Sequence, residues 1–170
     1  MQPLAERMRP TTLDEYIGQE KVVGHNAPLR KAIEAGHLPS CILWGPPGVG
    51  KTTIALSLAK HLYGDKYSEY TLELNASDER GIKMVRERIK TFAKLLCDTS
   101  IFPFKLIILD EADNMTSDSQ FALRKIMEDY AKVTRFCIIC NYHSKIIDPI
   151  VSRCSIFRFK PIPMDSIKQR

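Results

Sequence analysis

The chain has 170 residues, which as a prior means one domain, with 44% hydrophobic and 26% charged residues and a formal net charge of +5 at pH 7. These values are ordinary for a globular protein, and no stretch is apolar for long enough to cross a bilayer. The mild positive charge weakly favours a polyanionic partner, although on this number alone a protein that is simply basic is the better explanation.

The N-terminus and the cysteines indicate where the chain works. The first residues, MQPLAERMRP, are charged and lack the apolar core of a signal peptide, so none is expected. Five cysteines without framework spacing favour reduced thiols in the cytosol or nucleus. Cys137 and Cys140 form a C-x-x-C inside a predicted strand, where an odd separation places the two sulfurs on opposite faces. We therefore expect neither a metal site nor a redox pair there.

Short apolar runs alternate with longer amphipathic segments. In chain order, the pattern predicts a helix over 26–36, a strand over 41–44, a helix over 51–63, a strand over 70–75, a helix over 82–96, a strand over 105–110, a helix over 118–131 and strands over 135–141 and 155–159. The runs KLIILD and RFCIICN are continuous, as in strands covered on both faces. The alternation predicts an α/β domain with a parallel sheet, whose site lies at the carboxyl ends of the strands.

A glycine-rich loop follows the first strand and opens a helix. Residues 45–52, GPPGVGKT, match G-x-x-x-x-G-K-[ST] in the strand–loop–helix setting that the motif requires. Such a loop surrounds phosphate oxygens with backbone N–H groups at a helix N-terminus. We expect Lys51 to reach the β- and γ-phosphates of ATP and the Thr52 hydroxyl to hold Mg²⁺. A coincidental Gly/Pro turn is the alternative.

A second motif, LIILDEAD, ends the strand over 105–110 in carboxylates. Asp110 is expected to bind the Mg²⁺ shell, directly or through water, and Glu111 to orient the attacking water as general base. The alternative is a solvated acidic loop. Together the two motifs predict a Mg²⁺-dependent nucleoside triphosphatase.

Much of the chain resembles one branch of such enzymes. LELNASDERGI, KLIILDEADNMT, ALRKIME, TRFCIICNY and SRCSIFRFKP, within roughly residues 62–162, resemble the small subunits of replication factor C in the clamp-loader branch of the AAA+ ATPases. The resemblance implies an AAA+ core with a five-stranded parallel sheet flanked by helices. It divides the chain into a nucleotide-binding domain over 1–165 and a tail over 166–170 leading to a helical lid that is missing.

Residues 1–60 look more like bacterial MgsA-type recombination-factor ATPases, through PLAERMRPTTLDEYIGQEKVVG and APLRKAIEAGHLPSCILWGPPGVGKTT. This suggests a chimera, or a truncated chain, with a join near residues 53–63. A contiguous natural gene would overturn the join. Both parents share the ATP-binding layout.

The resemblance implies further roles. Asn141 matches the sensor that contacts the γ-phosphate or the attacking water. Asn75 matches the residue that holds the glutamate unproductive until DNA binds, although from the residues alone it is a helix cap. Arg153 matches the arginine finger that serves a neighbouring subunit's ATP, where a surface salt bridge is the alternative. The expected nucleotide-binding set is Arg9, Ile17, Gly45, Pro46, Pro47, Gly48, Val49, Gly50, Lys51, Thr52, Thr53 and Asn141.

A basic stripe marks the helix over 82–96. Lys83, Arg86, Lys90 and Lys94 recur at steps of three, four and four, and Arg80 comes just before them. Periodicity alone favours a solvated helix face, but in clamp loaders this helix tracks DNA phosphates. We therefore expect Arg80, Arg86 and Lys90 to make sequence-independent DNA contacts.

The predicted function is the ATPase module of a sliding-clamp loader, weak in isolation, with ATP and Mg²⁺ as cofactors. Its expected partners are DNA, a sliding clamp and neighbouring AAA+ subunits, with no membrane, in the nucleus if it is replication factor C-like and otherwise in the cytoplasm. The alternatives are a nucleotide-binding module with negligible turnover, a recombination-factor ATPase at stalled forks, and a helicase fragment, although the helicase coupling motif SAT is absent.

Overall fold

The computed structural model describes residues 39–95, 100 and 102–160, so the helix expected over 26–36 and the residues Arg9 and Ile17 lie outside the described part. The strands are β1 (Cys41–Trp44), β2 (Thr71–Asn75), β3 (Lys105–Asp110), β4 (Thr134–Cys140) and β5 (Ser155–Arg158). The α-helices are α4 (Lys51–Tyr63), α5 (Tyr67–Tyr70), α6 (Gly81–Lys94), α7 (Ser117–Asp129) and α8 (Asp148–Val151), and the 3₁₀ helices are η2 (Gly64–Lys66), η3 (Ala112–Asn114) and η4 (His143–Lys145).

All five strands form one parallel sheet in the order β2-β3-β4-β1-β5. The five-stranded parallel sheet predicted from the sequence is thereby confirmed, each strand within one residue of its expected limits at either end. Because the strands are parallel, the loops after β1, β2, β3 and β4 all emerge at one edge of the sheet, the carboxyl edge. The segments that enter β1 and β5 lie at the opposite, amino edge.

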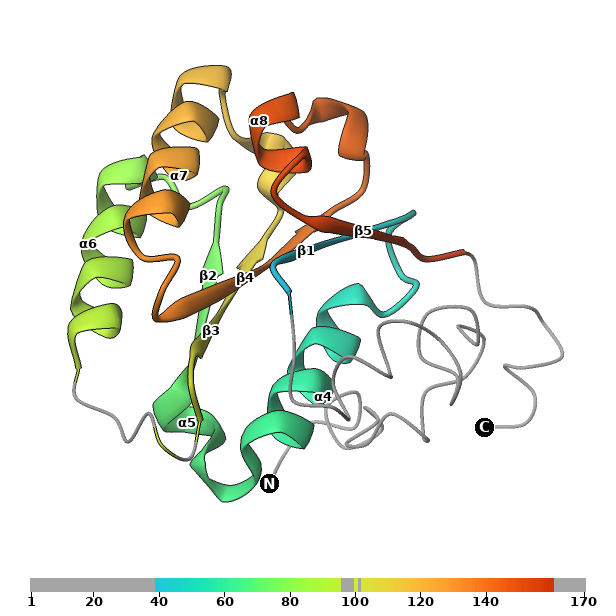
Figure 1. Ribbon diagram of the computed structural model, residues 1–170. Coiled ribbons are helices and arrows are strands. Elements are labelled where there is room, and N and C mark those ends of the chain that lie inside the picture. Colours follow the sequence, from blue (N-terminus) through green and yellow to red (C-terminus); the bar gives the residue numbers. More distant parts are fainter. Residues whose placement is uncertain (1–38, 96–99, 101, 161–170) are drawn as a thin grey trace, which may run out of the picture.

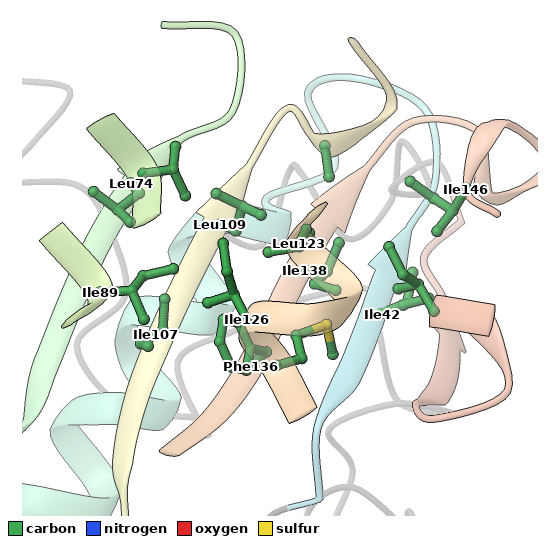
Figure 2. Packing of buried hydrophobic residues seen from close by; sticks show 14 of the residues in the cluster. Ile42, Leu74, Ile89, Ile107, Leu109, Leu123, Ile126, Phe136, Ile138 and Ile146 are labelled. Carbon is green, nitrogen blue, oxygen red and sulfur yellow. The ribbon is translucent and has the colours of Figure 1, made fainter. Parts of the chain in front are cut away.

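Helices cover both faces of the sheet (Figure 1). Alternate strand residues point to opposite faces, and the core divides accordingly into two clusters. On one face, Leu43 and Ile108 pack with Ile54 and Leu58 of α4. On the other face, residues such as Ile42, Leu109 and Ile138 pack beneath α6 and α7, which contribute Ile89, Leu123 and Ile126 (Figure 2). The continuous apolar runs of β3 and β4 thus reflect burial on both faces, as expected.

The helices begin and end for identifiable reasons. Thr116 accepts a hydrogen bond from the backbone N–H of Ser119 and so caps α7. At the C-terminal end of α6, the buried Lys105 ammonium donates to the carbonyls of Phe92, at 2.5 Å, and Leu95, at 2.7 Å, and so adds to the capping bond from the Leu95 N–H to the Phe92 carbonyl. Helices α5 and α8 were not predicted, because four-residue helices show no recognisable period.

The cysteines behave as buried apolar residues. Cys137 belongs to the α4-side cluster and Cys140 to the opposite one, which confirms that the C-x-x-C divides across the sheet. The described cysteines Cys41, Cys137, Cys140 and Cys154 are free thiols. Within the described residues, no helix is both long and apolar enough to span a membrane.

Candidate nucleotide-binding site

The glycine-rich loop of residues 45–50 joins β1 to α4 at the carboxyl edge of the sheet. Gly45 packs so closely against the end of β5 that a Cβ placed on it would lie 2.3 Å from the Phe159 carbonyl oxygen. Gly50, the N-cap of α4, has φ 86°, a left-handed conformation that a side chain disfavours. The loop can therefore bring its backbone N–H groups against an anion at the start of α4, the geometry that phosphate binding needs.

The Lys51 side chain crosses this loop. It is 7% exposed, and its ammonium donates to the carbonyls of Gly45, at 2.5 Å, and Pro46, at 3.0 Å, and to Asn141 Oδ1, at 2.9 Å. Burial lowers the pKa of Lys51, and the nearby groups Cys140, Asp110 and Asp113 oppose that shift. The structure thus joins the predicted phosphate lysine to the predicted sensor, across 90 residues of sequence.

Thr52 and Asp110 also meet. The Thr52 hydroxyl donates to Asp110 Oδ2 at 2.9 Å, so the two expected Mg²⁺ ligands lie side by side at the start of α4 and the end of β3. A hydroxyl and a carboxylate suit Mg²⁺, which takes one or two protein oxygens together with phosphates and water. Among the described residues no group of three His, Cys, Asp or Glu side chains could hold a metal ion. The oxygen atoms of Thr52 and Asp110 therefore fit a Mg²⁺ ion whose other ligands are phosphate oxygens and water.

Glu111 follows Asp110 and is exposed, with φ 55° and ψ 38°, so a residue with a side chain occupies the left-handed region. Its backbone N–H donates to Asp110 Oδ1 at 2.8 Å. Of the non-glycine residues described, Glu111 alone has a positive φ. Strain of this kind gathers at functional sites, where the surrounding structure holds it in place.

Asn75, which by the resemblance holds the glutamate, is connected to Glu111 through Ser77. Ser77 stands between the two, since its hydroxyl donates to Glu111 Oε2 at 2.6 Å and reaches Asn75 Oδ1 at the same distance. Asn75 Oδ1 also accepts from the backbone N–H of Ser77 at 2.8 Å, an Asx turn that positions this hydroxyl. Ser77 was not predicted as a site residue, because serine is common in turns and nothing in its spacing indicates a partner 34 residues away.

Two further residues missed by the sequence analysis tie neighbouring elements together. Asp113 Oδ2 accepts from the backbone N–H groups of Asn141, at 3.1 Å, and Tyr142, at 3.2 Å. Gln120, 3% exposed, donates to the Lys145 carbonyl at 2.9 Å and accepts from the Ile147 N–H at 2.8 Å, which joins α7 to the segment before α8. The DEAD run gave a signal for Asp113, whereas a buried glutamine on a helix gives none.

Arg153 lies away from this site. It precedes β5, and the next residue but one, Ser155, donates its backbone N–H to the carbonyl of Ser40, which comes just before β1. Arg153 is therefore at the amino edge, across the sheet from Lys51 and Asp110. Its guanidinium lies 3.7 Å from Glu128, with 38% of the Arg153 side chain exposed. Burial raises the pKa of the neighbouring Cys154 thiol to about 12, so that thiol is no nucleophile at neutral pH.

The basic stripe of α6 faces solvent. Lys83, Arg86, Lys90 and Lys94 are all exposed, while Val85, Ile89 and Phe92 of the same helix are buried. Arg80 is exposed as well, but Asp78 holds it: Nε and Nη2 of Arg80 donate to the Asp78 carboxylate at 3.1 and 2.9 Å, and the backbone N–H of Arg80 donates to it at 2.9 Å. These contacts lower the pKa of Asp78 to about 2. The stripe is thus accessible to a polyanion, and a polyanion would compete with Asp78 for Arg80.

Known proteins resemble this chain in sequence and in fold. Residues 41–162 match the family model described as "ATPase family associated with various cellular activities (AAA)". The chain belongs to the AAA family of ATPases. This membership confirms the expected enzyme class, a P-loop ATPase.

Curated relatives of this AAA chain include archaeal replication factor C small subunits. Small subunit 1 of Pyrobaculum aerophilum is 55% identical over 165 residues, covering 97% of this chain and 49% of the relative. The small subunit of Sulfolobus acidocaldarius is 49% identical over 166 residues, covering 98% of this chain and 50% of the relative. The chain thus spans about half the length of the curated relatives it matches.

Solved structures share the fold at low sequence identity. The Thermotoga maritima RuvB P216G mutant superposes with a TM-score of 0.70 at 22% identity, covering 95% of this chain and 52% of that one. A DNA polymerase III gamma subunit-related protein from the same organism gives a TM-score of 0.60 at 19% identity, covering 81% and 46%. These likenesses bear on the fold alone.

Proposed function

We propose that the chain is the ATP-binding and ATP-hydrolysing module of a DNA clamp loader of the replication factor C small-subunit type. The observation that carries the proposal is the meeting of Lys51 with Asn141, and of Thr52 with Asp110, at the carboxyl edge of the sheet. The identity to archaeal replication factor C small subunits supports the clamp-loader assignment.

Each residue of the site has a proposed task. The loop of residues 45–50 and Lys51 bind the phosphates, Thr52 and Asp110 hold Mg²⁺, and Glu111 takes a proton from the attacking water. The bound cation would screen the phosphate charge against the approaching water oxygen. We keep Thr53, Arg9 and Ile17 as proposed nucleotide contacts, the last two for the adenine. Asn141 is proposed to meet the terminal phosphate or the water.

Arg153 is proposed to act on the ATP of a neighbouring subunit. Its place at the amino edge supports this, because an arginine there is on the far side of the sheet from its own Lys51 and Asp110. A fixed planar cation supplied in trans is worth a rate factor of about 10³–10⁵. The contact with Glu128 at 3.7 Å, between exposed side chains, is weak enough to exchange for a phosphate.

The glutamate switch is proposed to involve Asn75 through Ser77. The strand order supports it: β2, which ends at Asn75 and leads into Ser77, flanks β3 on the side away from β4 and β1. The bond between Ser77 and Glu111 therefore holds the carboxylate on the side of β3 away from the phosphate loop. In this pose Glu111 is withdrawn from a water that attacks the terminal phosphate.

DNA is proposed to bind along α6 through Arg80, Arg86 and Lys90, by phosphate contacts without sequence preference. The exposure of the stripe supports the contact. Reversing charge at Arg86 and Lys90 should weaken duplex binding at low salt and reduce its salt dependence, while the same change at Lys125 on α7 serves as control. Unchanged affinity would remove DNA from the proposal.

The sliding clamp, the neighbouring AAA+ subunits and a cytoplasmic location come to the proposal through the archaeal relatives. A nuclear location finds no support in archaeal relatives. The AAA+ domain over 1–165 and the tail over 166–170 stay a proposal. The alignments cover at least 165 of 170 residues and so run through residues 53–63. A join there stays a hypothesis, and a contiguous gene would overturn it.

Mixing two inactive variants tests the whole proposal. Lys51→Ala inactivates a subunit's own ATP site, and Arg153→Ala removes the arginine that the subunit contributes to its neighbour's ATP site. In a ring of head-to-tail contacts, an equal mixture restores about a quarter of the sites, where the arginine of one variant meets the intact site of the other. If the mixture were as inactive as either variant alone, Arg153 would not act on the ATP of a neighbouring subunit. Measurable ATP affinity with a flat, near-zero rate at all protein concentrations would favour the alternative, a nucleotide-binding module without turnover.

A further inference from the structure

The carboxylate of Asp113 binds the backbone where β4 ends. Asp113 lies in η3, just past the end of β3, and its Oδ2 accepts from the N–H groups of Asn141 and Tyr142 at 3.1 and 3.2 Å. The register of β1 with β4 stops at Trp44 and Cys140, so these two N–H groups lie beyond the strand ladder. One carboxylate oxygen thus supplies the acceptor that the next strand does not provide.

This contact fixes the side chain that meets Lys51. Asn141 leaves the backbone at the point that Asp113 holds, and its Oδ1 accepts from Lys51 Nζ at 2.9 Å. Rotation of the β4 exit would move the Asn141 amide away from the phosphate loop. Charge acts in the same direction, because the half-buried Asp113 favours the protonated form of Lys51 against the effect of burial.

We propose that Asp113 is a positioning residue for recognition of the terminal phosphate: it holds the β4 exit so that Asn141 faces the phosphate loop. The inference rests on the proposed function, which assigns Asn141 to the terminal phosphate. The four residues of the DEAD run then have three roles. Asp110 binds the cation, Glu111 activates the attacking water and Asp113 positions Asn141.

A purely local role for Asp113 makes different predictions. An acid in the first turn of η3 favours that turn through its dipole alone, and its loss would then weaken the turn without touching β4. The backbone amides of Asn141 and Tyr142 distinguish the two roles, because only the positioning role depends on their hydrogen bonds to Asp113.

The first experiment measures hydrogen exchange at the amides of Asn141 and Tyr142 by NMR, without nucleotide. Both should be protected in the unmodified chain. Asp113→Ala should speed their exchange by roughly tenfold, the loss expected for a hydrogen bond to a charged acceptor. Asp113→Asn keeps an oxygen acceptor and should retain most of the protection. Asp118→Ala, which removes an exposed acid in the first turn of α7, is the matched control and should change nothing.

The second experiment measures ATP and ADP affinities by calorimetry with Mg²⁺. Asn141→Ala should lower the preference for ATP over ADP, and Asp113→Ala should lower it in the same direction. The double variant should lose no more than Asn141→Ala alone, since both changes break one link. Asp113→Asn should recover the preference.

Three results would overturn the positioning role. These are unprotected Asn141 and Tyr142 amides in the unmodified chain, equal weakening of ATP and ADP by Asp113→Ala, and full additivity in the double variant. The first needs no variant and so holds even if Asp113→Ala does not fold. If the unmodified chain bound no ATP, the proposed function would fail instead. An unmodified chain that prefers ATP, with Asp113→Ala indistinguishable from it, would sink the inference alone.

Discussion

The left-handed backbone at Glu111 predicts an unusual order of stabilities among its variants. With φ 55° and ψ 38°, any residue carrying a Cβ bears a cost of about 1–2 kcal/mol there, and glycine bears none. Glycine also has a more disordered unfolded state, which costs about 0.4–1 kcal/mol. At the middle of these two ranges, Glu111→Gly is more stable than Glu111→Ala by about 0.8 kcal/mol. Both variants lose the bond to Ser77, so that loss cancels in the comparison.

The assay is thermal and urea unfolding of matched pairs. For a domain of this size, about 1 kcal/mol moves Tm by about 2–4 °C. Glu87 supplies the control, because it is exposed in the interior of α6, where glycine is worse than alanine by about 1 kcal/mol. The preference should therefore reverse between the two sites. Glu111→Ala equal to or more stable than Glu111→Gly would refute the claim that the backbone at Glu111 is strained.

Three other predictions follow from single contacts. Ser77→Ala should raise the basal ATPase rate with little change in KM, because Glu111 loses the bond that holds it on the β2 side, and an unchanged or lower rate would contradict this. NMR titration should place the pKa of Asp78 at about 2, and Arg80→Ala should return it toward 3.8, its ordinary value. The stabilising contact is then fully present above pH 3.8 and lost as pH falls through 2, and an Asp78 pKa indifferent to Arg80→Ala would count against it. Lys105→Met should lower the free energy of unfolding by about 2 kcal/mol, since it removes the charged donor of one buried and one part-buried hydrogen bond, to the carbonyls of Phe92 and Leu95. Lys125→Met should leave the free energy of unfolding unchanged.

The fold could be predicted because its signals are local. The continuous apolar runs of β3 and β4 reflect burial on two faces, and the three- and four-residue steps of α6 reflect burial on one side, so both patterns appear directly in the sequence. The glycines of the phosphate loop allow the left-handed backbone that the loop adopts, so its conformation could be predicted from the motif. The helices α5 and α8 did not appear, because four residues are too few for a period.

The sequence indicated which residues form the site, but not most of the hydrogen bonds between them. Motif spacing indicated Lys51 and Asp110, but the partners of a hydrogen bond across 28 or 34 residues depend on strand order, which spacing does not give. Ser77 and Asp113 were missed for this reason, since each acts on a residue from a neighbouring strand. Once β2 lies beside β3, and β3 beside β4, both contacts follow from adjacency at one edge.

The two edges of the sheet also bear on how such modules would communicate. At the carboxyl edge, the segments after β2, β3 and β4 are joined by hydrogen bonds through Ser77 and Asp113, so a displacement of one segment reaches the next. Gln120 links α7 to the segment before α8, and that segment leads to Arg153 at the amino edge. A ligand that moves the β2 exit therefore has a bonded route through Asn141 to Lys51 and the phosphate loop. Among the described contacts, the route to Arg153 passes through α7. Because α7 begins near the DEAD run and carries Glu128, 3.7 Å from Arg153, a shift of α7 would couple a subunit's own site to its neighbour's under the role proposed for Arg153.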